Sequence, residues 1–476
     1  MRRWNNKIWY TIAVSAVLAA GILNGCGSAA SNVNVESFDI QQAFAEDMSN
    51  ADVLSSDSLN GEALPFGHEI QTETVNENKS NIKMEIETET AVIVEEGAVE
   101  KTQVLEAENT ANKASELTLI MIGDILLHTP VAESGVQQDG SYDFTALFAN
   151  VRDEVEAADL ALVNQEVILG GTALGITGYP NFNAPFELGD ALVEAGFDVV
   201  LHATNHTLDK GKKGVTNCLS FWEDKYPQIT VLGINESQEA QEDHIFVYEQ
   251  EDIRVAVLNY TYGTNGIPMP SDMPYAVNLL EEKKVTADIA KAKTRSDFII
   301  VCPHWGTEYQ LVPSAEQERW IQIFLENGVD LVIGTHPHVI EPIEWVRDDN
   351  GNEMLVYYSL GNFVNWTSSS GKGIANRMVG GMAEITLARE PEGDVAVKSY
   401  GVEPIVCHLG EGANGVTTYF LSEYTEEMAS QNAIIEQDAA FSRQYCLDLC
   451  EQVWGEWGQD IQEYESKHNS KHYLLY

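Results

Sequence analysis

The chain has 476 residues, and its 74 Asp and Glu residues against 27 Lys and Arg give a formal net charge of -47 at pH 7. A chain this acidic repels the phosphate backbone of nucleic acids, which excludes them as partners. A small anionic substrate is not excluded, because a bound metal ion reverses the local field whatever the charge of the whole chain. The hydrophobic content of 44% is typical of a globular protein, and the length allows one large domain with additional segments.

The first 26 residues have the pattern of an export signal. Basic residues precede an uncharged, mostly apolar run over 8–23, which is shorter than the about 20 residues that a membrane-spanning helix needs. The run ends in Leu-Asn-Gly-Cys at 23–26, which resembles the lipobox of bacterial lipoproteins. We therefore predict a lipoprotein signal peptide over 1–26, with lipid on Cys26 anchoring an extracytoplasmic protein to the bacterial membrane. The alternative is an uncleaved membrane anchor.

Residues 27–115 are rich in Glu, Asp, Asn, Ser and Thr and contain only three aromatic residues. A segment of this composition lacks the apolar surface that a packed core needs. We predict a disordered acidic linker over 27–115, which holds the folded part away from the membrane surface. The alternative, a small independent domain, is disfavoured because no stretch shows a sustained amphipathic period.

From Glu116 the pattern changes to alternating apolar strands and amphipathic helices. Strands are predicted over 117–122, 160–163, 197–201, 229–232, 244–248, 253–258, 298–302 and 331–333, and helices over 186–195, 211–226, 279–292 and 314–327. The two strands joined by the turn 249–252 predict a hairpin, and Ser314 with Gln317 predicts a capping box. The alternation predicts an α/β domain over 116–415 with mixed, mostly parallel sheets.

The last part of the chain changes character again. Strand-like runs over 382–387 and 395–406 close the predicted domain, and beyond about Gly415 the sequence becomes polar and helical. We predict a helical C-terminal extension over 416–476 that packs against the domain.

The cysteines do not form a legible disulfide framework. Apart from Cys26 there are five, which cannot all pair, and Cys302 inside an apolar strand is predicted to be a buried free thiol. Cys446 and Cys450 are four residues apart on a predicted helix, which is poor geometry for a disulfide.

Residue types that bind metals or transfer protons follow the predicted strands at several positions. They are Asp124, Glu166, Asn205 with His206, His304, and His336 with His338. The carboxyl ends of parallel strands meet at one edge of a sheet, where open α/β sheets bind ligands. A single such histidine is more often structural, but so many strand ends with these groups favour a shared site. Carboxylate, imidazole and amide donors suit Mn, Fe or Zn, and a pair of such ions activates water for attack on phosphorus.

Six motifs occur in order over about 117–364. They are Gly-Asp at 123–124, Asn-Gln-Glu at 164–166, Asn-His-Thr-Leu-Asp-Lys-Gly at 205–211, His-Trp-Gly-Thr-Glu-Tyr at 304–309, Gly-Thr-His-Pro-His at 334–338 and Tyr-Ser-Leu-Gly-Asn-Phe at 358–363. Together they resemble the ordered motifs of the CapA family, the poly-gamma-glutamate capsule synthesis proteins. The resemblance implies a calcineurin-like metallophosphatase fold, a four-layer α/β sandwich.

The resemblance also implies roles for individual residues. The metal ligands, for one or two divalent ions, are Asp124, Glu166, Asn205, His304, His336 and His338. His206 matches the residue that assists the leaving group. Asp209 either orients His206 or caps the following helix. Trp305, Glu308 and Tyr309 flank His304 and are candidates to line a substrate groove, with interior packing as the alternative for Trp305 and Tyr309.

Three positions depart from the metallophosphatase pattern. Leu126 stands where a His is usual, Glu166 where a bridging Asp is expected, and Thr204 where Asn is frequent. The motifs therefore leave open whether one metal ion binds or two. His128 is a candidate replacement ligand, and the alternative is an exposed loop histidine.

Two functions are compatible with the sequence. The first is a membrane-anchored, metal-dependent hydrolase that cleaves a phosphoester or related bond in capsule, poly-gamma-glutamate or other envelope polymer metabolism. The second is a non-catalytic, polymer-binding component of a polyglutamate synthesis and export complex, with the membrane components of the synthase as partners. The intact Asn205-His206 and His336-Pro337-His338 motifs favour the first, and Leu126 favours the second.

Overall fold

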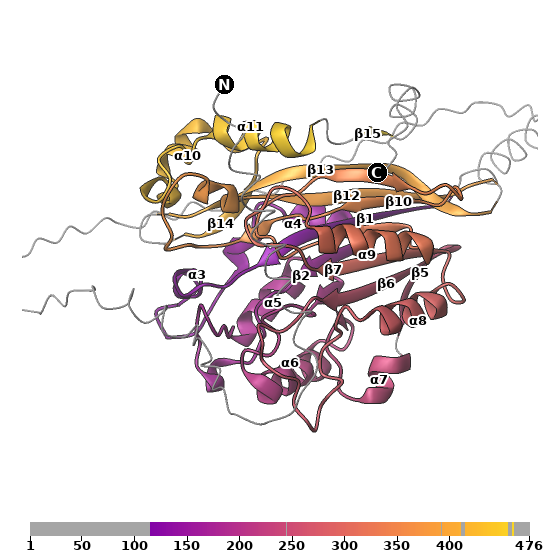
Figure 1. Cartoon of the computed structure of the whole chain (residues 1–476). Helices are drawn as coiled ribbons and strands as arrows, with labels where there is room; N and C mark the ends of the chain where they lie inside the picture. Colours follow the sequence, from indigo (N-terminus) through magenta and orange to yellow (C-terminus); the bar gives the residue numbers. More distant parts are fainter. Residues whose placement is uncertain (1–114, 244, 392, 411–414, 456–458, 461–476) are drawn as a thin grey trace, which may run out of the picture. The chain divides into compact units, whose positions relative to one another are not determined.

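The computed structural model describes residues 115–243, 245–391, 393–410, 415–455 and 459–460 (Figure 1). The chain divides into two units, residues 1–93 and 94–476, and only the second contains described residues. The predicted signal peptide and all but the last residue of the predicted linker lie outside the described residues. Within the described part, none of the helices combines the length and the apolar character that crossing a membrane requires.

The first sheet has nine strands and joins a parallel half to an antiparallel half. Its strands are β1 (Glu116–Ile125), β2 (Leu160–Asn164), β3 (Val199–Leu201), β4 (Thr230–Leu232), β11 (Asn362–Val364), β12 (Val379–Arg389), β13 (Val395–His408), β14 (Thr417–Phe420) and β15 (Gln459–Asp460). The order is β14-β13-β12-β1-β2-β3-β4, with β11 on β1 and β15 on β13. From β1 to β4 the pairs are parallel, whereas β12, β13 and β14 run antiparallel to their neighbours.

The second sheet has six strands and is also mixed. They are β5 (Phe246–Gln250), β6 (Ile253–Thr261), β7 (Phe298–His304), β8 (Leu331–Ile333), β9 (Ile343–Arg347) and β10 (Glu353–Tyr357), in the order β5-β6-β7-β8-β10-β9. The central pairs are parallel and both outer pairs are antiparallel. The predicted hairpin is confirmed, because β5 and β6 pair antiparallel.

Helices connect and cover the strands. The α-helices are α3 (Thr129–Ser134), α4 (Arg152–Ala157), α5 (Phe186–Glu194), α6 (Gly211–Lys225), α7 (Gln238–Asp243), α8 (Glu282–Ala292), α9 (Ala315–Glu326), α10 (Glu426–Gln431) and α11 (Arg443–Trp454), and the short 3-10 helices are η1 (Thr145–Leu147), η2 (Thr172–Leu174), η3 (Ile374–Met378) and η5 (Ala433–Glu436). The predicted capping box begins α9, where the Ser314 hydroxyl accepts a bond from the Gln317 amide and Gln317 Oε1 accepts one from the Ser314 amide.

The side chains of β7 show how the layers pack. Phe298, Ile300 and Cys302 join the core between the two sheets, where Cys302 Sγ lies 3.9 Å from Met121 Sδ on β1. Ile299 and Val301 face the other way and pack against α8 and α9, which lie beside β6 and β7 in Figure 1. Since alternate residues of a strand face opposite sides, β7 is buried on both faces. The predicted mixed α/β sandwich is confirmed by this layering.

The expected helical start of the C-terminal extension is wrong. Residues 417–420 form β14, which pairs antiparallel with β13 and continues the first sheet past residue 415. Thr418 and Phe420 are buried while Thr417 and Tyr419 are partly exposed, so the segment has the period of two of a strand. Threonine and aromatic residues favour such a pleated, half-buried surface.

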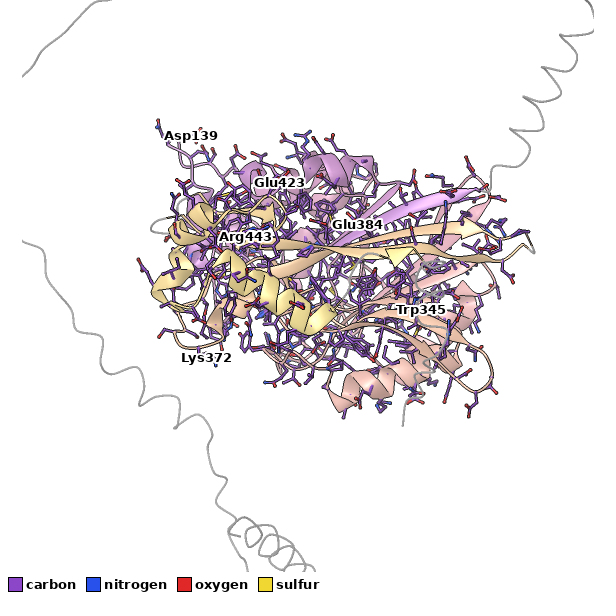
Figure 2. All side chains as sticks on the ribbon, turned by 90° about the horizontal axis from the view of Figure 1, so that it is seen from above. Asp139, Trp345, Lys372, Glu384, Glu423 and Arg443 are labelled. Carbon is purple, nitrogen blue, oxygen red and sulfur yellow. The ribbon has the colours of Figure 1, made fainter. Side chains whose placement is uncertain are left out.

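The helical part of the extension begins after β14. α10 and α11 follow, and α11 lies over β13 (Figure 1); seen from above, Arg443 marks its first turn (Figure 2). Trp454 at its end is buried and donates to the carbonyl of Glu341 at 2.9 Å. The five described cysteines, Cys302 among them, are buried free thiols.

Candidate metal centre

The predicted ligands lie where strands of both sheets end. Asp124 is on β1, Glu166 follows β2, Asn205 follows β3, His304 ends β7, and His336 with His338 follows β8. All six are buried, with relative exposures between 0% and 4%. The facing edges of the two sheets thus bring together carboxylate, amide and imidazole groups that the sequence spreads over more than two hundred residues.

Two glycines let the backbone converge at this edge. A Cβ on Gly123 would lie 2.0 Å from the carbonyl oxygen of Gly361, which accepts a hydrogen bond from the Asp124 amide at 3.0 Å. A Cβ on Gly334 would lie 2.1 Å from the carbonyl oxygen of Tyr358. Only glycine permits these approaches, so the glycines of two motifs position the ligands that follow them.

The turn after β8 holds two histidines in a left-handed backbone. His336 has a φ of 100° and His338 a φ of 58°, a region that residues with a Cβ seldom adopt. The His336 amide donates to Asp124 Oδ2 at 3.2 Å, and the carbonyl of Pro337 accepts from the Tyr309 amide at 2.8 Å. Such a conformation costs on the order of 1–3 kcal/mol and persists only where surrounding contacts fix it, most often at functional sites.

The ligand atoms fall into two sets that share one carboxylate. Glu166, His304 and His336 form one set, and Asp124, Glu166 and His338 form the other, with the chosen atoms of each set within 4.8 Å of one another. Glu166 therefore occupies the position of a bridging carboxylate between two ion sites. Asn205 adds an oxygen to the first set, since its Oδ1 lies 3.0 Å from His304 Nε2.

A third set contains a residue that the sequence interpretation did not assign as a ligand. Glu308 lies with His336 and His338 within the same 4.8 Å, and its side chain is exposed. The sequence signal that could have identified Glu308 as a ligand is its place in the same motif as His304, four residues later. Glu308 is therefore a further candidate carboxylate ligand at the cluster.

The unpaired polar atoms of the cluster fit a divalent cation. Both carboxylate oxygens of Glu166 and Nδ1 of His336 are buried and have no hydrogen-bond partner among the described residues. Burial raises the pKa of Glu166 well above its usual value, and burial together with neighbouring histidines holds the pKa of His304 and of His336 well below theirs. Neutral imidazoles and a carboxylate without a hydrogen-bond donor suit a divalent metal ion.

His338 carries the compensating charge in the metal-free cluster. Burial opposes its protonation, but the Glu166 and Asp124 carboxylates outweigh this effect and raise its pKa to about 10. Its Nδ1 lies 3.1 Å from Asp124 Oδ2, and its Nε2 lies 3.6 Å from Glu166 Oε1. A bound cation neutralises the same two carboxylates, so metal binding releases this proton.

Three polar residues within or beside the motifs hold the ligands in place and were not assigned from the sequence. Asn164 Nδ2 donates to Asp124 Oδ1 at 2.8 Å, and Thr335 Oγ1 lies 3.0 Å from His304 Nδ1. Asn362 Nδ2 donates to the carbonyl of His338 at 2.9 Å, and its Oδ1 lies 3.1 Å from His338 Nδ1. Such partners fix the orientation of metal ligands.

His206 and Asp209 form a pair beside the cluster. His206 Nδ1 lies 2.7 Å from Asp209 Oδ2, which also accepts from the Phe182 amide at 2.7 Å. The short contact places the proton on Nδ1 and leaves Nε2, 4.0 Å from Glu166 Oε1, facing the cluster. Of the two roles predicted for Asp209, the contacts favour orientation of His206, because α6 begins without a side-chain cap.

The remaining sequence candidates lie around the cluster. Thr204 Oγ1 donates to the carbonyl of Glu166 at 2.7 Å and accepts from the His206 amide at 3.2 Å, so it joins the loops after β2 and β3. His128 belongs to none of the ligand sets found among the described residues. Its ring lies 5.0 Å from that of Phe182 and 6.0 Å from that of Trp366, and burial lowers its pKa to about 3. His128 therefore lines the groove beside the cluster and is not a candidate ligand.

The cluster opens into a groove of about 780 Å³. Its lining includes His128, Asn181, Glu308, Tyr309, Trp366 and Arg377. Of the aromatic residues predicted either to line a groove or to pack, Tyr309 lines the groove and is 42% exposed. Trp305 packs in the interior and donates to the carbonyl of Tyr358 at 3.0 Å.

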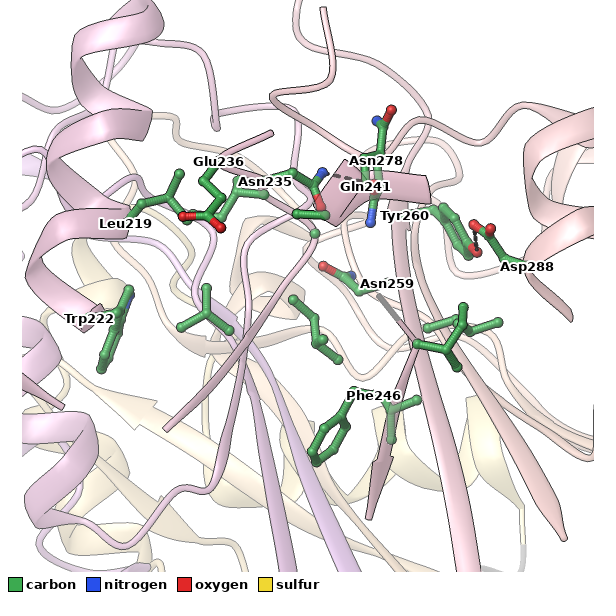
Figure 3. A pocket seen from close by; sticks show the side chains of 18 of the residues that line it. Leu219, Trp222, Asn235, Glu236, Gln241, Phe246, Asn259, Tyr260, Asn278 and Asp288 are labelled. Carbon is green, nitrogen blue, oxygen red and sulfur yellow. Dashed lines mark hydrogen bonds between the residues drawn. The ribbon is translucent and has the colours of Figure 1, made fainter. Parts of the chain in front are cut away.

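A second cavity, of about 340 Å³, lies beside β4 and β6 and contains none of the metal ligands (Figure 3). Several of its polar side chains pair with one another. The Tyr260 hydroxyl donates to Asp288 Oδ2 at 3.0 Å, and Asn235 Nδ2 donates to Asn278 Oδ1 at 3.0 Å.

The strands, helices and buried cluster define a mixed α/β sandwich with candidate metal ligands at its strand ends. Residues 118–367 match the family described as bacterial capsule synthesis protein PGA_cap. The match covers more than half of the chain, and the chain belongs to this family. The predicted CapA membership is thereby confirmed.

Two relatives and one solved structure illustrate the similarity. The chain is 28% identical over 264 residues to capsule biosynthesis protein CapA of Bacillus anthracis, covering 53% of this chain and 61% of the relative. It is 29% identical over 180 residues to PGA biosynthesis protein CapA of Bacillus subtilis (strain 168), covering 37% and 45%. The chain thus spans about half the length of the curated relatives it matches. Haemophilus influenzae NAD nucleotidase aligns with a TM-score of 0.39 and 14% identity, covering 75% of this chain and 68% of that one.

Proposed function

We propose that this protein is an exported, metal-dependent hydrolase that cleaves a phosphoester or related bond in capsule, poly-gamma-glutamate or other envelope polymer metabolism. The family and the ligand cluster support this proposal. The observation that carries it is Glu166, a buried carboxylate whose two oxygens have no hydrogen-bond partner among the described residues, which is shared by two ligand sets and lies 4.0 Å from His206. Anchoring to the bacterial membrane through Cys26 is part of the proposal and is supported by the lipobox alone.

The proposed metal ligands are Asp124, Glu166, Asn205, His304, His336 and His338, with Mn, Fe or Zn as the ions that suit them. Such ions polarise a phosphoryl oxygen and lower the pKa of a bound water when they occupy a site of this kind. Asn164, Thr335 and Asn362 fix the ligand orientations. The chain itself therefore supplies a rigid cluster that needs little reorganisation.

His206 is the proposed proton donor to the leaving group. Asp209 accepts from Nδ1 and stabilises the protonated ring, while Nε2 faces the cluster across the groove. A positioned acid of this kind contributes about 10²–10⁴-fold in rate. His206 is 6% exposed, so its proton is delivered within the groove.

A non-catalytic role remains the second candidate, because Leu126 puts an apolar side chain where a ligand is usual and is itself buried. In that case the cluster binds an envelope polymer for a polyglutamate synthesis and export complex, with membrane components of the synthase as partners. The two candidates differ in turnover, because binding requires the ligands while hydrolysis also requires His206.

The test measures metal content and hydrolysis of a phosphoester panel, including bis(4-nitrophenyl) phosphate, with the full chain. We expect His206→Ala to keep its metal and lose activity by about 10²-fold or more. Asn205→Ala is expected to lose both. His408→Gln is the matched control, because His408 lies apart from the cluster and pairs with the Tyr424 hydroxyl. Full activity of His206→Ala refutes the mechanism, and a metal-loaded parent without turnover on every phosphoester favours the binding role.

A further inference from the structure

Arg377 lines the groove without a carboxylate partner. It lies on η3, and its guanidinium stacks 3.6 Å above the centre of the Tyr309 ring. Its Nη1 donates to Thr367 Oγ1 at 3.1 Å. No carboxylate among the described residues lies within ion-pair distance of it, and its side chain is half-buried.

Five of the eight described arginines form ion pairs with carboxylates, whereas Arg295, Arg377 and Arg443 do not, and of these three Arg377 lines the groove. The described arginines that form ion pairs with carboxylates are Arg152, Arg254, Arg319, Arg347 and Arg389. A guanidinium has five N–H donors in a planar fork that matches phosphate and carboxylate oxygens. At Arg377 one face is stacked and one donor is used within the chain, so the rest of the fork is free for an anion in the groove.

The position of Arg377 is coupled to the metal centre. Asn362 Nδ2 donates to the carbonyl of Arg377 at 2.9 Å, and Asn362 Oδ1 lies 3.1 Å from His338 Nδ1. The Tyr309 ring, on which Arg377 stacks, lies 6.1 Å from the ring of His338. The Tyr309 ring thus lies between Arg377 and His338. A ligand that contacts both Arg377 and the metal ligands therefore places its anionic group beyond this ring, away from the cluster.

The C-terminal extension holds the segment that carries Arg377. Asp438 Oδ2 accepts from the Gly373 amide at 2.8 Å, and the carbonyl of Gln437 accepts from the Gly371 amide at 2.9 Å. The Tyr445 hydroxyl donates to Asn376 Oδ1. Binding groups fixed in this way lose little conformational freedom when a ligand binds.

We propose that Arg377 binds an anionic group of the substrate, a phosphate or a carboxylate, at a point separate from the bond that reacts at the cluster. The proposal rests on the proposed function in so far as that function places the substrate in the groove. It makes Arg377 a specificity residue, which selects substrates that carry a second negative charge beside the reacting bond. The stack on Tyr309 and the bond to Thr367 orient the fork.

Arginine footprinting with phenylglyoxal tests the anion site in the metal-free full chain. Modification of each arginine is followed by peptide mass spectrometry, with glutarate or glycerol 3-phosphate as the probe. A probe at twice its dissociation constant slows modification about threefold at the site that binds it. We expect this protection at Arg377 and none at the exposed Arg347. Protection by one probe alone identifies its anionic group, and equal rates with and without both probes overturn the proposal.

Variants measure the contribution of the fork. In a calorimetric titration we expect the protecting probe to bind Arg377→Met about tenfold more weakly than the parent, because a charge-assisted pair is lost. Arg377→Lys is expected to recover part of the affinity. Arg347→Gln controls for the loss of one positive charge. Equal affinity in the parent and Arg377→Met overturns the proposal. Protection of Arg377 without hydrolysis by the metal-loaded chain refutes only the hydrolase, whereas hydrolysis without protection refutes only the anion site.

Discussion

Replacing Glu166 by Gln separates the cost of the buried carboxylate from its use as a ligand. Both of its oxygens lack a hydrogen-bond partner among the described residues, and a buried polar group without one costs about 1–3 kcal/mol. Burial raises its pKa well above the usual value, so the charged carboxylate is costly in the metal-free chain, and Gln removes that charge with little change of shape. We expect the metal-free variant to be at least as stable as the wild type.

With metal present the two proteins are expected to diverge. A metal at 100 times its dissociation constant adds about 2.7 kcal/mol to the free energy of unfolding, because it binds only the folded state. Glu166 belongs to both ligand sets, so its loss weakens both ion sites. If affinity falls by about 100-fold, the gain at the same metal concentration falls to about 0.4 kcal/mol.

Urea unfolding of the full chain, followed by tryptophan fluorescence with and without Mn²⁺, measures both effects. Glu341→Gln is the matched control, since Glu341 is a buried carboxylate that accepts from Gln317 and belongs to no ligand set. An equal metal-dependent gain in Glu166→Gln and wild type would refute the assignment of Glu166 as the shared ligand. A loss of the gain in Glu341→Gln as well would trace the effect to general destabilisation.

Three further outcomes are expected. Asn362→Ala should weaken metal binding about 10–100-fold, because it removes the partner that orients His338; unchanged Mn²⁺ affinity in a direct titration contradicts this. Burial raises the pKa of Glu341 to about 8, so the folded chain holds a proton that the unfolded chain releases near pH 4.5, and stability falls as pH rises between these values. Glu341→Gln should remove about 3 kcal/mol of that decline between pH 5 and 7.5, as urea unfolding at the two values would show. Cys26→Ser should move the protein from the membrane to the soluble fraction or leave an uncleaved precursor, and unchanged processing and extraction count against the lipid anchor.

The positions of the ligands along the strands could be predicted because buried strands leave a plain pattern. β8 is a run of three apolar residues that ends just before its histidines, and β7 ends at His304. In parallel strands the register then brings successive ends to one level, as where Asp124 on β1 pairs with Asn164 on β2. A short apolar run followed by a polar residue can be recognised in the sequence alone. Because parallel strands end at the same edge of a sheet, the polar residues that follow them lie close together.

Other features of the site depend on contacts between distant segments. The left-handed backbone at His336 and His338 is imposed by neighbours such as Asp124, and no residue type at those positions indicates it. Arg377 reaches the groove because Gln437 and Asp438 hold its segment. The sequence predicts helix at β14 because its four residues are too few to show the alternation of buried and exposed side chains, and the residues that follow are polar and helical.

The support that the C-terminal extension gives to η3 has a consequence for the diversity of the family. The family match ends at residue 367, so the metal ligands, Tyr309 and Thr367 lie inside the matched region, whereas Arg377 and its support Asp438 lie outside it. We expect a chimaera that receives the stretch corresponding to residues 371–378 from a relative to keep its metal ligands and to change its preference for anionic substrates.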